Sequence, residues 1–155
     1  MTELEQLENE AYRNNVDVIR YPFRSKKIKG LYCNGTVALN NTLDTDTEKK
    51  CILAEELGHY HTTVGNVLDQ TSLDNRKQER TARIWAYDKL IGVTGLITAY
   101  KAGCKSLYEI AEHLSVSEPF LLEAIDIYKQ KYGMYTTIDN YIIYFEPHLG
   151  VLELV

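Results

Sequence analysis

The sequence predicts an α+β fold, and three observations support this class. Short strand-like runs around an Asn-Gly turn stand near the N-terminus, helical periodicity dominates the middle, and a second β-like stretch stands near the C-terminus. With 155 residues the chain is long enough to bury a core without disulfides. Its three cysteines, which are odd in number and form no CxxC pair, favour a reducing compartment.

The first elements are a helix and a small β region. A helix is expected over residues 2–14 and a strand, ended by a proline, over residues 16–23. Residues 26–41 hold two short apolar runs around Asn34 and Gly35, which is typical of a β-hairpin. The helical spacing in the first segment is carried by Leu4, Leu7, Ala11 and Tyr12.

Two longer helices are expected in the middle of the chain. Thr45 and Glu48 have the spacing of a capping box, and the helix they open should continue through residue 61 and end near Gly65. A second helix is expected over residues 75–91, followed by an exit at Gly92 and Gly95. Its apolar stripe consists of Ala82, Trp85, Ala86 and Leu90.

The remainder should form a helical unit that ends in β structure. Helices are expected over residues 94–103, 106–114 and 117–133, and a β segment with a turn at Asp139 and Asn140 over residues 134–147. We therefore predict two domains, a first domain over residues 1–92 and a helical unit with a terminal β segment over residues 93–155.

Part of the helical unit has a helix-turn-helix-like layout. Residues 106–133 contain five acidic residues against two basic ones, whereas a helix that reads the major groove needs arginine, lysine or amide side chains. No direct nucleic-acid binding is expected. The role that we expect for this unit is packing on the first domain and helping to dock a partner.

Charge and hydropathy bear on the binding partners and the cellular location of the protein. The 22 acidic and 17 basic residues give a net charge of −5, which repels phosphate backbones at long range. The acidic N-terminus does not have the pattern of a signal peptide, and no apolar run approaches the roughly 20 residues that cross a bilayer. A cytoplasmic protein is the expectation.

The stretch AEELGHYHTT, residues 54–63, contains the candidate metal site. Residues four apart project from one face of a helix, so Glu55 and His59 could hold one ion together, with Glu56 beside them. In HExxH zinc peptidases the two ends of the motif bind the metal, and the glutamate polarises the attacking water. The same spacing occurs by chance in amphipathic helices, and spacing alone leaves that reading open.

A catalytic site needs a third protein ligand and an open position for water. Glu79, twenty residues after His59 and in the next expected helix, is our choice. His61 is an alternative, but it points about 200° away from His59 on a regular helix and could join only if the helix ends first.

Two segments resemble the ImmA/IrrE family of small metallopeptidases, which are encoded by phages, mobile elements and their bacterial hosts. These are LAEELGHYHTT, and QERTARIWAYDKLI with Glu79, Ala82, Trp85 and Ala86 in the pattern ExxAxxFA. The resemblance implies a minigluzincin-like fold with a short N-terminal sheet and an active-site helix pair. It also implies that His59 and Glu79 are metal ligands and that Glu56 is the general base.

The departure from the family pattern is Glu55, which stands where histidine is usual. Either Glu55 takes over coordination, or the site has lost tight zinc and the fold persists as a binding module. We favour the first, because Glu56, His59 and Glu79 all keep competent identities. A carboxylate binds zinc less well than imidazole, so weaker binding or another divalent ion such as manganese is expected.

The resemblance further implies a substrate class. Proteins of this kind are associated with cleavage or other inactivation of helix-turn-helix repressors, which releases a lysogenic or mobile-element programme. A repressor-type protein in the cytoplasm is therefore the expected partner.

Overall fold

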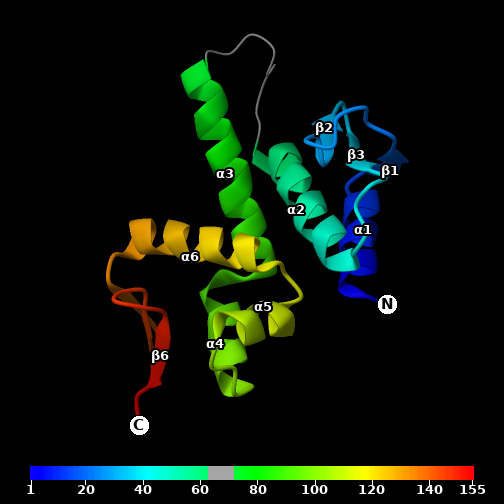
Figure 1. Cartoon of the computed structure of the whole chain (residues 1–155). Coiled ribbons are helices and arrows are strands. Elements are labelled where there is room, and N and C mark those ends of the chain that lie inside the picture. Colours follow the sequence, from blue (N-terminus) through cyan, green and yellow to red (C-terminus); the bar gives the residue numbers. More distant parts are fainter. Residues whose placement is uncertain (63–71) are drawn as a thin grey trace. The chain divides into compact units, whose positions relative to one another are not determined.

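The computed structural model describes residues 1–62 and 72–155, which divide into two units, Met1–Ala86 and Tyr87–Val155 (Figure 1). Each unit combines helices with one three-stranded sheet. The predicted α+β class is confirmed.

Helix α1 (Glu3–Arg13) opens the first unit. A capping box begins it: the Thr2 hydroxyl accepts a hydrogen bond from the Glu5 backbone N–H at 3.1 Å, and the Thr2 N–H donates to the Glu5 carboxylate at 3.0 Å. Its buried residues are Leu4, Leu7 and Ala11. Tyr12, the fourth member of the apolar repeat in the sequence, is 78% exposed, so this side chain does not join the core.

The first sheet has the strand order β1-β3-β2. Its strands are β1 (Asp17–Tyr21), β2 (Gly30–Cys33) and β3 (Thr36–Asn40), with β1 parallel and β2 antiparallel to β3. The hairpin turn lies at Asn34 and Gly35, whose φ angles of 47° and 80° are the positive values that a two-residue hairpin requires. The predicted strand and hairpin are confirmed.

A buried polar residue, Asn40, ends β3 and holds the connection between β1 and β2. It is 1% exposed. Its side-chain amide donates to the carbonyl oxygens of Ile28 at 2.7 Å and Ser25 at 3.4 Å, and its side-chain oxygen accepts from the Thr42 N–H at 3.1 Å. The segment before β2 is therefore anchored to the core at two backbone positions.

Replacing Asn40 by Ala is expected to lower the free energy of unfolding by about 1–3 kcal/mol, because it leaves buried backbone groups without their partner. Urea unfolding followed by circular dichroism measures this effect. Asn41→Ala is the matched control, since Asn41 is exposed and contributes only its backbone N–H to the fold. Equal unfolding midpoints for the two variants would contradict the role of Asn40.

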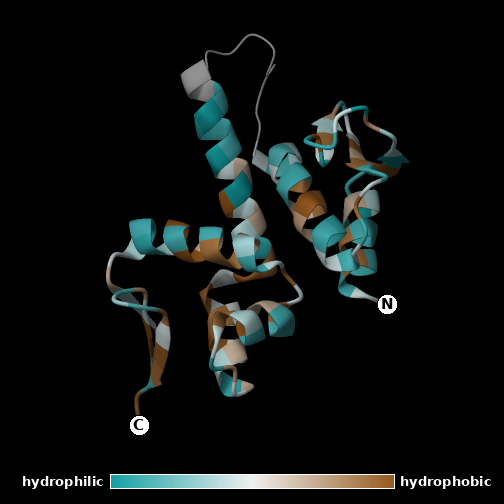
Figure 2. Ribbon diagram, in the orientation of Figure 1, coloured by the Kyte–Doolittle hydropathy of each residue, from teal (hydrophilic) through white to brown (hydrophobic). Residues whose placement is uncertain are grey.

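Helices α2 (Asp46–Thr62) and α3 (Ser72–Leu90) follow the sheet. Thr45 caps α2 by accepting from the Glu48 N–H at 3.1 Å, as the sequence predicts. The predicted end near Gly65 lies outside the described residues. In Figure 2 the coloured N-terminal part of α3 is hydrophilic. The helix becomes more apolar further along, where Ala82 and Ala86 are fully buried.

The second unit contains α4 (Gly92–Lys101), α5 (Leu107–Leu114) and α6 (Glu118–Tyr132). Ser106 and Ser117 cap α5 and α6 through their hydroxyls. Gly92, with φ of 64°, separates α3 from α4, as an exit requires. Gly95, by contrast, lies inside α4, so its predicted role as part of the exit is wrong. No described helix is both long and apolar enough to cross a bilayer.

The second sheet is antiparallel and has the order β4-β5-β6. Its strands are β4 (Tyr135–Ile138), β5 (Tyr141–Tyr144) and β6 (Gly150–Glu153). The predicted turn at Asp139 and Asn140 joins β4 to β5. The strand β6 lies beyond the stretch predicted as β, because GVLE is too short and too weakly patterned to identify without its pairing partner.

Candidate metal centre

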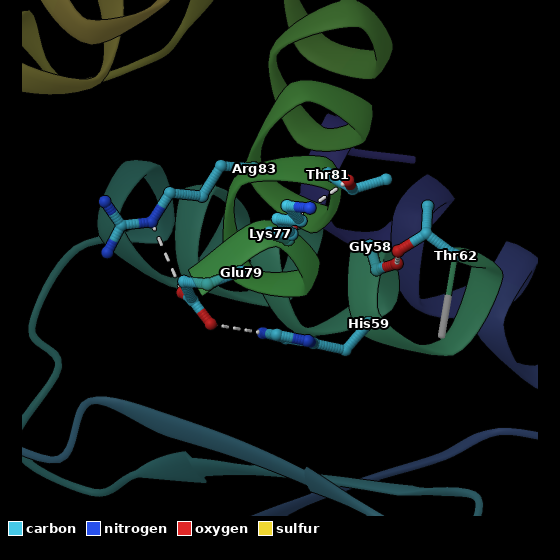
Figure 3. Close-up of polar contacts among 7 residues, drawn as sticks. All are labelled: Gly58, His59, Thr62, Lys77, Glu79, Thr81 and Arg83. Atoms are coloured by element: carbon cyan, nitrogen blue, oxygen red, sulfur yellow. Dashed lines mark hydrogen bonds and ion pairs between the residues drawn. The ribbon is translucent and has the colours of Figure 1, made fainter. Parts of the chain in front are cut away.

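The central contact of the site joins helix α2 to helix α3. His59 on α2 and Glu79 on α3 point toward each other, and the His59 Nε2 lies 2.9 Å from a Glu79 carboxylate oxygen (Figure 3). The other Glu79 oxygen lies 3.3 Å from the Arg83 Nε one turn later on α3. Residues twenty apart in the sequence are thus brought into direct contact.

The close approach of these helices depends on a glycine. A Cβ placed on Gly58 would lie 2.2 Å from the carbonyl oxygen of Ala82, and Ala82 is fully buried. Backbone therefore meets backbone at this point. Gly58 precedes His59, and Ala82 lies three residues after Glu79, so the contact holds the two side chains at hydrogen-bonding distance.

Glu56 lies beside this pair and against the sheet. The backbone N–H of Tyr32 in β2 lowers the pKa of its carboxyl group, against the larger effect of burial. A Cβ on Gly30, at the start of β2, would be 3.2 Å from the Glu56 Cγ. Glu56 is therefore held between the edge strand β2 and the His59–Glu79 pair.

The electrostatics of Glu56 suit a group that exchanges a proton. Burial raises its pKa above the ordinary carboxyl value, and the charge of Glu79 adds to the rise. The charge of His59 and the Tyr32 N–H act in the opposite direction. The net effect is a raised pKa, which is what a general base near neutral pH requires.

His59 and Glu79 shift each other in the way expected of an ion pair. The hydrogen bond from His59 lowers the pKa of Glu79, and the same bond raises the pKa of His59 against the opposing effect of burial. Arg83 lowers the pKa of Glu79 further. Each group is thus stabilised in its charged form when no metal lies between them.

The separation and chemistry of the His59–Glu79 pair fit two ligands of one metal ion. Two ligands on one tetrahedral zinc ion stand about 3.3 Å apart, given bond lengths of about 2.0–2.1 Å. The 2.9 Å between the His59 nitrogen and the Glu79 oxygen is close to this separation, and one imidazole with one carboxylate is a donor pair that zinc accepts.

Glu55 is the third predicted metal ligand. It is half-buried on α2 and its charge contributes to raising the pKa of His59. Among the residues that the structure describes, however, no three His, Cys, Asp or Glu side chains lie close enough together to hold an ion. Coordination by Glu55 stays a prediction.

His61 takes a different position from the one a ligand needs. Helix α2 continues to Thr62, so the early helix end that would turn His61 toward His59 does not occur. Its ring instead stacks on Trp85 of α3, with centroids 4.5 Å apart and planes 17° apart. This stack is a second contact between the two helices.

The sequence predicts that His59 and Glu79 act together, and the structure brings these two side chains into contact, but the groups that position them are not evident from the sequence. Gly58 has no assigned role in the first motif, Ala82 is expected only as part of an apolar stripe, and the Tyr32 backbone N–H carries no signal in a sequence. The glycine inside EELGH was the one available clue, because glycine in a helix interior is costly unless close packing needs it.

Comparison with known proteins identifies one family. A family model described as the IrrE N-terminal-like domain, Peptidase M78, matches residues 11–126, a range that contains His59, Glu79 and Glu56. No curated protein matches the chain.

Proposed function

The chain belongs to the Peptidase M78 family, with an IrrE N-terminal-like domain, and from that premise we propose that it is a metal-dependent endopeptidase that cleaves a helix-turn-helix repressor in the cytoplasm. The family supports a metallopeptidase-type function. The repressor of a phage or mobile element, and the relief of repression that follows its cleavage, are the finer part of the proposal.

The observation that carries the proposal is the 2.9 Å contact between His59 and Glu79 with Glu56 beside it. In the proposed site Glu55, His59 and Glu79 hold the ion, which is zinc or another divalent ion such as manganese. When bound, the ion supplies Lewis-acid activation of water and of the peptide carbonyl.

Glu56 is the proposed proton carrier. Its raised pKa lets the carboxylate take a proton from the attacking water and hold it until the leaving amine needs it. The proton thus passes from water to the amine by way of one side chain, and the peptide C–N bond breaks.

Strand β2 is the proposed surface for the substrate backbone. It is at the edge of the sheet that the described residues form, and its Tyr32 and Gly30 lie against Glu56. An extended segment that pairs with this edge would run past Glu56 with its backbone held by main-chain hydrogen bonds.

A second candidate function has two observations in its favour. The described residues contain no group of three metal-binding side chains, and Glu55 stands where the family pattern has histidine. In this alternative the fold inactivates its repressor by contact alone, as a binding module without catalysis.

Metal content tests the proposed centre. Protein purified without added metal is expected to contain about one divalent ion per chain, and Glu79→Gln and Glu55→Gln are each expected to lower its metal affinity by at least about tenfold, since a ligand is lost. Elemental analysis measures both results. Glu112→Gln, an exposed glutamate in the second unit, is the control.

Wild-type protein that contains no ion and gains none on dialysis against zinc or manganese would contradict the enzyme proposal. An unchanged metal content in Glu55→Gln, with a loss in Glu79→Gln, would remove Glu55 from the ligand set. Incubation with repressors encoded near the gene, followed by mass spectrometry of the products, tests the substrate class.

A further inference from the structure

The connection between β1 and β2 is strongly basic. It carries Arg24, Lys26, Lys27 and Lys29, all exposed, and we call residues 24–29 the basic loop. No acidic residue occurs between Asp17 and Asp44. The structure records no ion pair between these four side chains and any described residue, so their charges face solvent.

Hydrogen bonds from the buried residue Asn40 anchor the basic loop. The buried Asn40 amide bonds the carbonyl oxygens of Ser25 and Ile28, and the Asn40 backbone N–H donates to the Lys29 carbonyl at 2.9 Å. The Ile28 N–H also donates to the Ser25 carbonyl at 3.3 Å. An anchored loop loses less conformational entropy when it binds than a free one.

The basic loop leads directly to the candidate active site. Lys29 is followed by Gly30, the first residue of β2, where an added Cβ would contact the Glu56 side chain. A chain segment that pairs with the β2 edge and passes Glu56 therefore also passes the basic loop. Ile28 and Leu31, 43% and 51% exposed, offer it apolar contacts.

We propose that the basic loop selects acidic residues in the extended protein segment that docks along β2. The inference deepens the proposed function, because it names the chemistry of the substrate segment at that same site. The expected occupant has Asp or Glu near the scissile bond, interspersed with apolar residues.

The charge of the remaining chain favours a peptide over a nucleic acid. Arg20 and the four basic side chains of the basic loop account for five of the 17 basic residues. The rest of the chain therefore has 12 basic residues against 22 acidic ones. A duplex longer than the loop would meet this net negative charge, whereas an extended peptide contacts only the basic loop and the β2 edge beside it.

Binding of labelled peptides tests the inference. The probes are two fluorescein-labelled peptides of the same length and apolar residues, one with Asp and Glu and the other with Asn and Gln at the same positions. Fluorescence anisotropy with the full chain is expected to give a Kd about tenfold lower for the acidic peptide at low salt, and a smaller ratio at about 0.3 M salt.

Two charge-matched variants localise the effect. Lys26→Gln/Lys27→Gln is expected to reduce the preference for the acidic peptide to about threefold or less. Lys105→Gln/Lys131→Gln removes the same charge from exposed lysines of the second unit and should leave the preference unchanged. The lysines are exposed in both variants, so folding, checked by circular dichroism, should be retained.

Equal Kd values for the two peptides, or equal effects of the two variants, would overturn the proposal. Tighter binding of a single-stranded or duplex oligonucleotide at the same salt would overturn it in favour of nucleic acid. The Glu56→Gln chain should keep the preference for the acidic peptide. A chain that shows this preference but contains no metal and cleaves nothing would refute the enzyme proposal and leave this one standing.

Discussion

Glu56→Gln is expected to lower the rate of the proposed repressor cleavage by at least about 10²–10⁴-fold, the range for loss of a general base. Glutamine has nearly the same shape as glutamate but cannot take a proton from water. This similar shape should leave the local structure intact. Metal content should be unchanged, because Glu56 is not one of the proposed ligands.

The measurement compares cleavage by wild type, Glu56→Gln and Glu48→Gln. Glu48 stands in the first turn of the same helix, away from the site, and its substitution is the matched control. If Glu56→Gln inactivates the repressor as well as the wild type does, the function is that of the binding module. If it loses both metal and stability, Glu56 has a structural role instead of the one proposed.

Gly58→Ala is expected to separate α2 from α3 and to disrupt the His59–Glu79 contact. Alanine is favoured over glycine in a helix by about 0.8–1.0 kcal/mol. The new Cβ, however, would lie 2.2 Å from the Ala82 carbonyl oxygen, and overpacking of this kind costs about 1–3 kcal/mol. Since a backbone atom cannot rotate away, we expect the clash to outweigh the helix preference, with a net loss of up to about 2 kcal/mol in the free energy of unfolding.

The glycine in α4 provides the control. A Cβ on Gly95 would meet the Leu114 Cδ2 at 3.5 Å, an ordinary contact, so Gly95→Ala is expected to raise stability by about 0.4–1 kcal/mol. Urea unfolding measures both changes, and elemental analysis follows the metal. Equal stability and metal content in Gly58→Ala and the wild type would show that the close helix contact does not position the site.

Much of the secondary structure follows from residues close together in the chain. Thr2 and Glu5 form the capping box of α1, and Asn34 and Gly35 adopt the positive φ angles of the hairpin turn. Ser117 caps α6 through its hydroxyl. These signals act through neighbouring backbone groups, which is why they are legible in a sequence.

The predictions that failed concern contacts between distant residues. Tyr12 has the helical spacing of Leu4 and Leu7 but is exposed to solvent. Strand β6 acquires its structure by pairing with β5. Gly95 is predicted to mark the exit of α3, yet it lies inside α4, where the cost of a glycine is modest.

The candidate site also depends partly on local sequence and partly on tertiary packing. The identities of Glu55, Glu56, His59 and Glu79, and the helices that carry them, are written in two short motifs of the chain. The contact of His59 with Glu79 comes instead from packing, because it requires α2 and α3 to touch where Gly58 meets Ala82. Periodicity and caps act over a few neighbouring residues, whereas convergence of segments twenty residues apart depends on which surfaces pack most closely, and only the folded chain selects them.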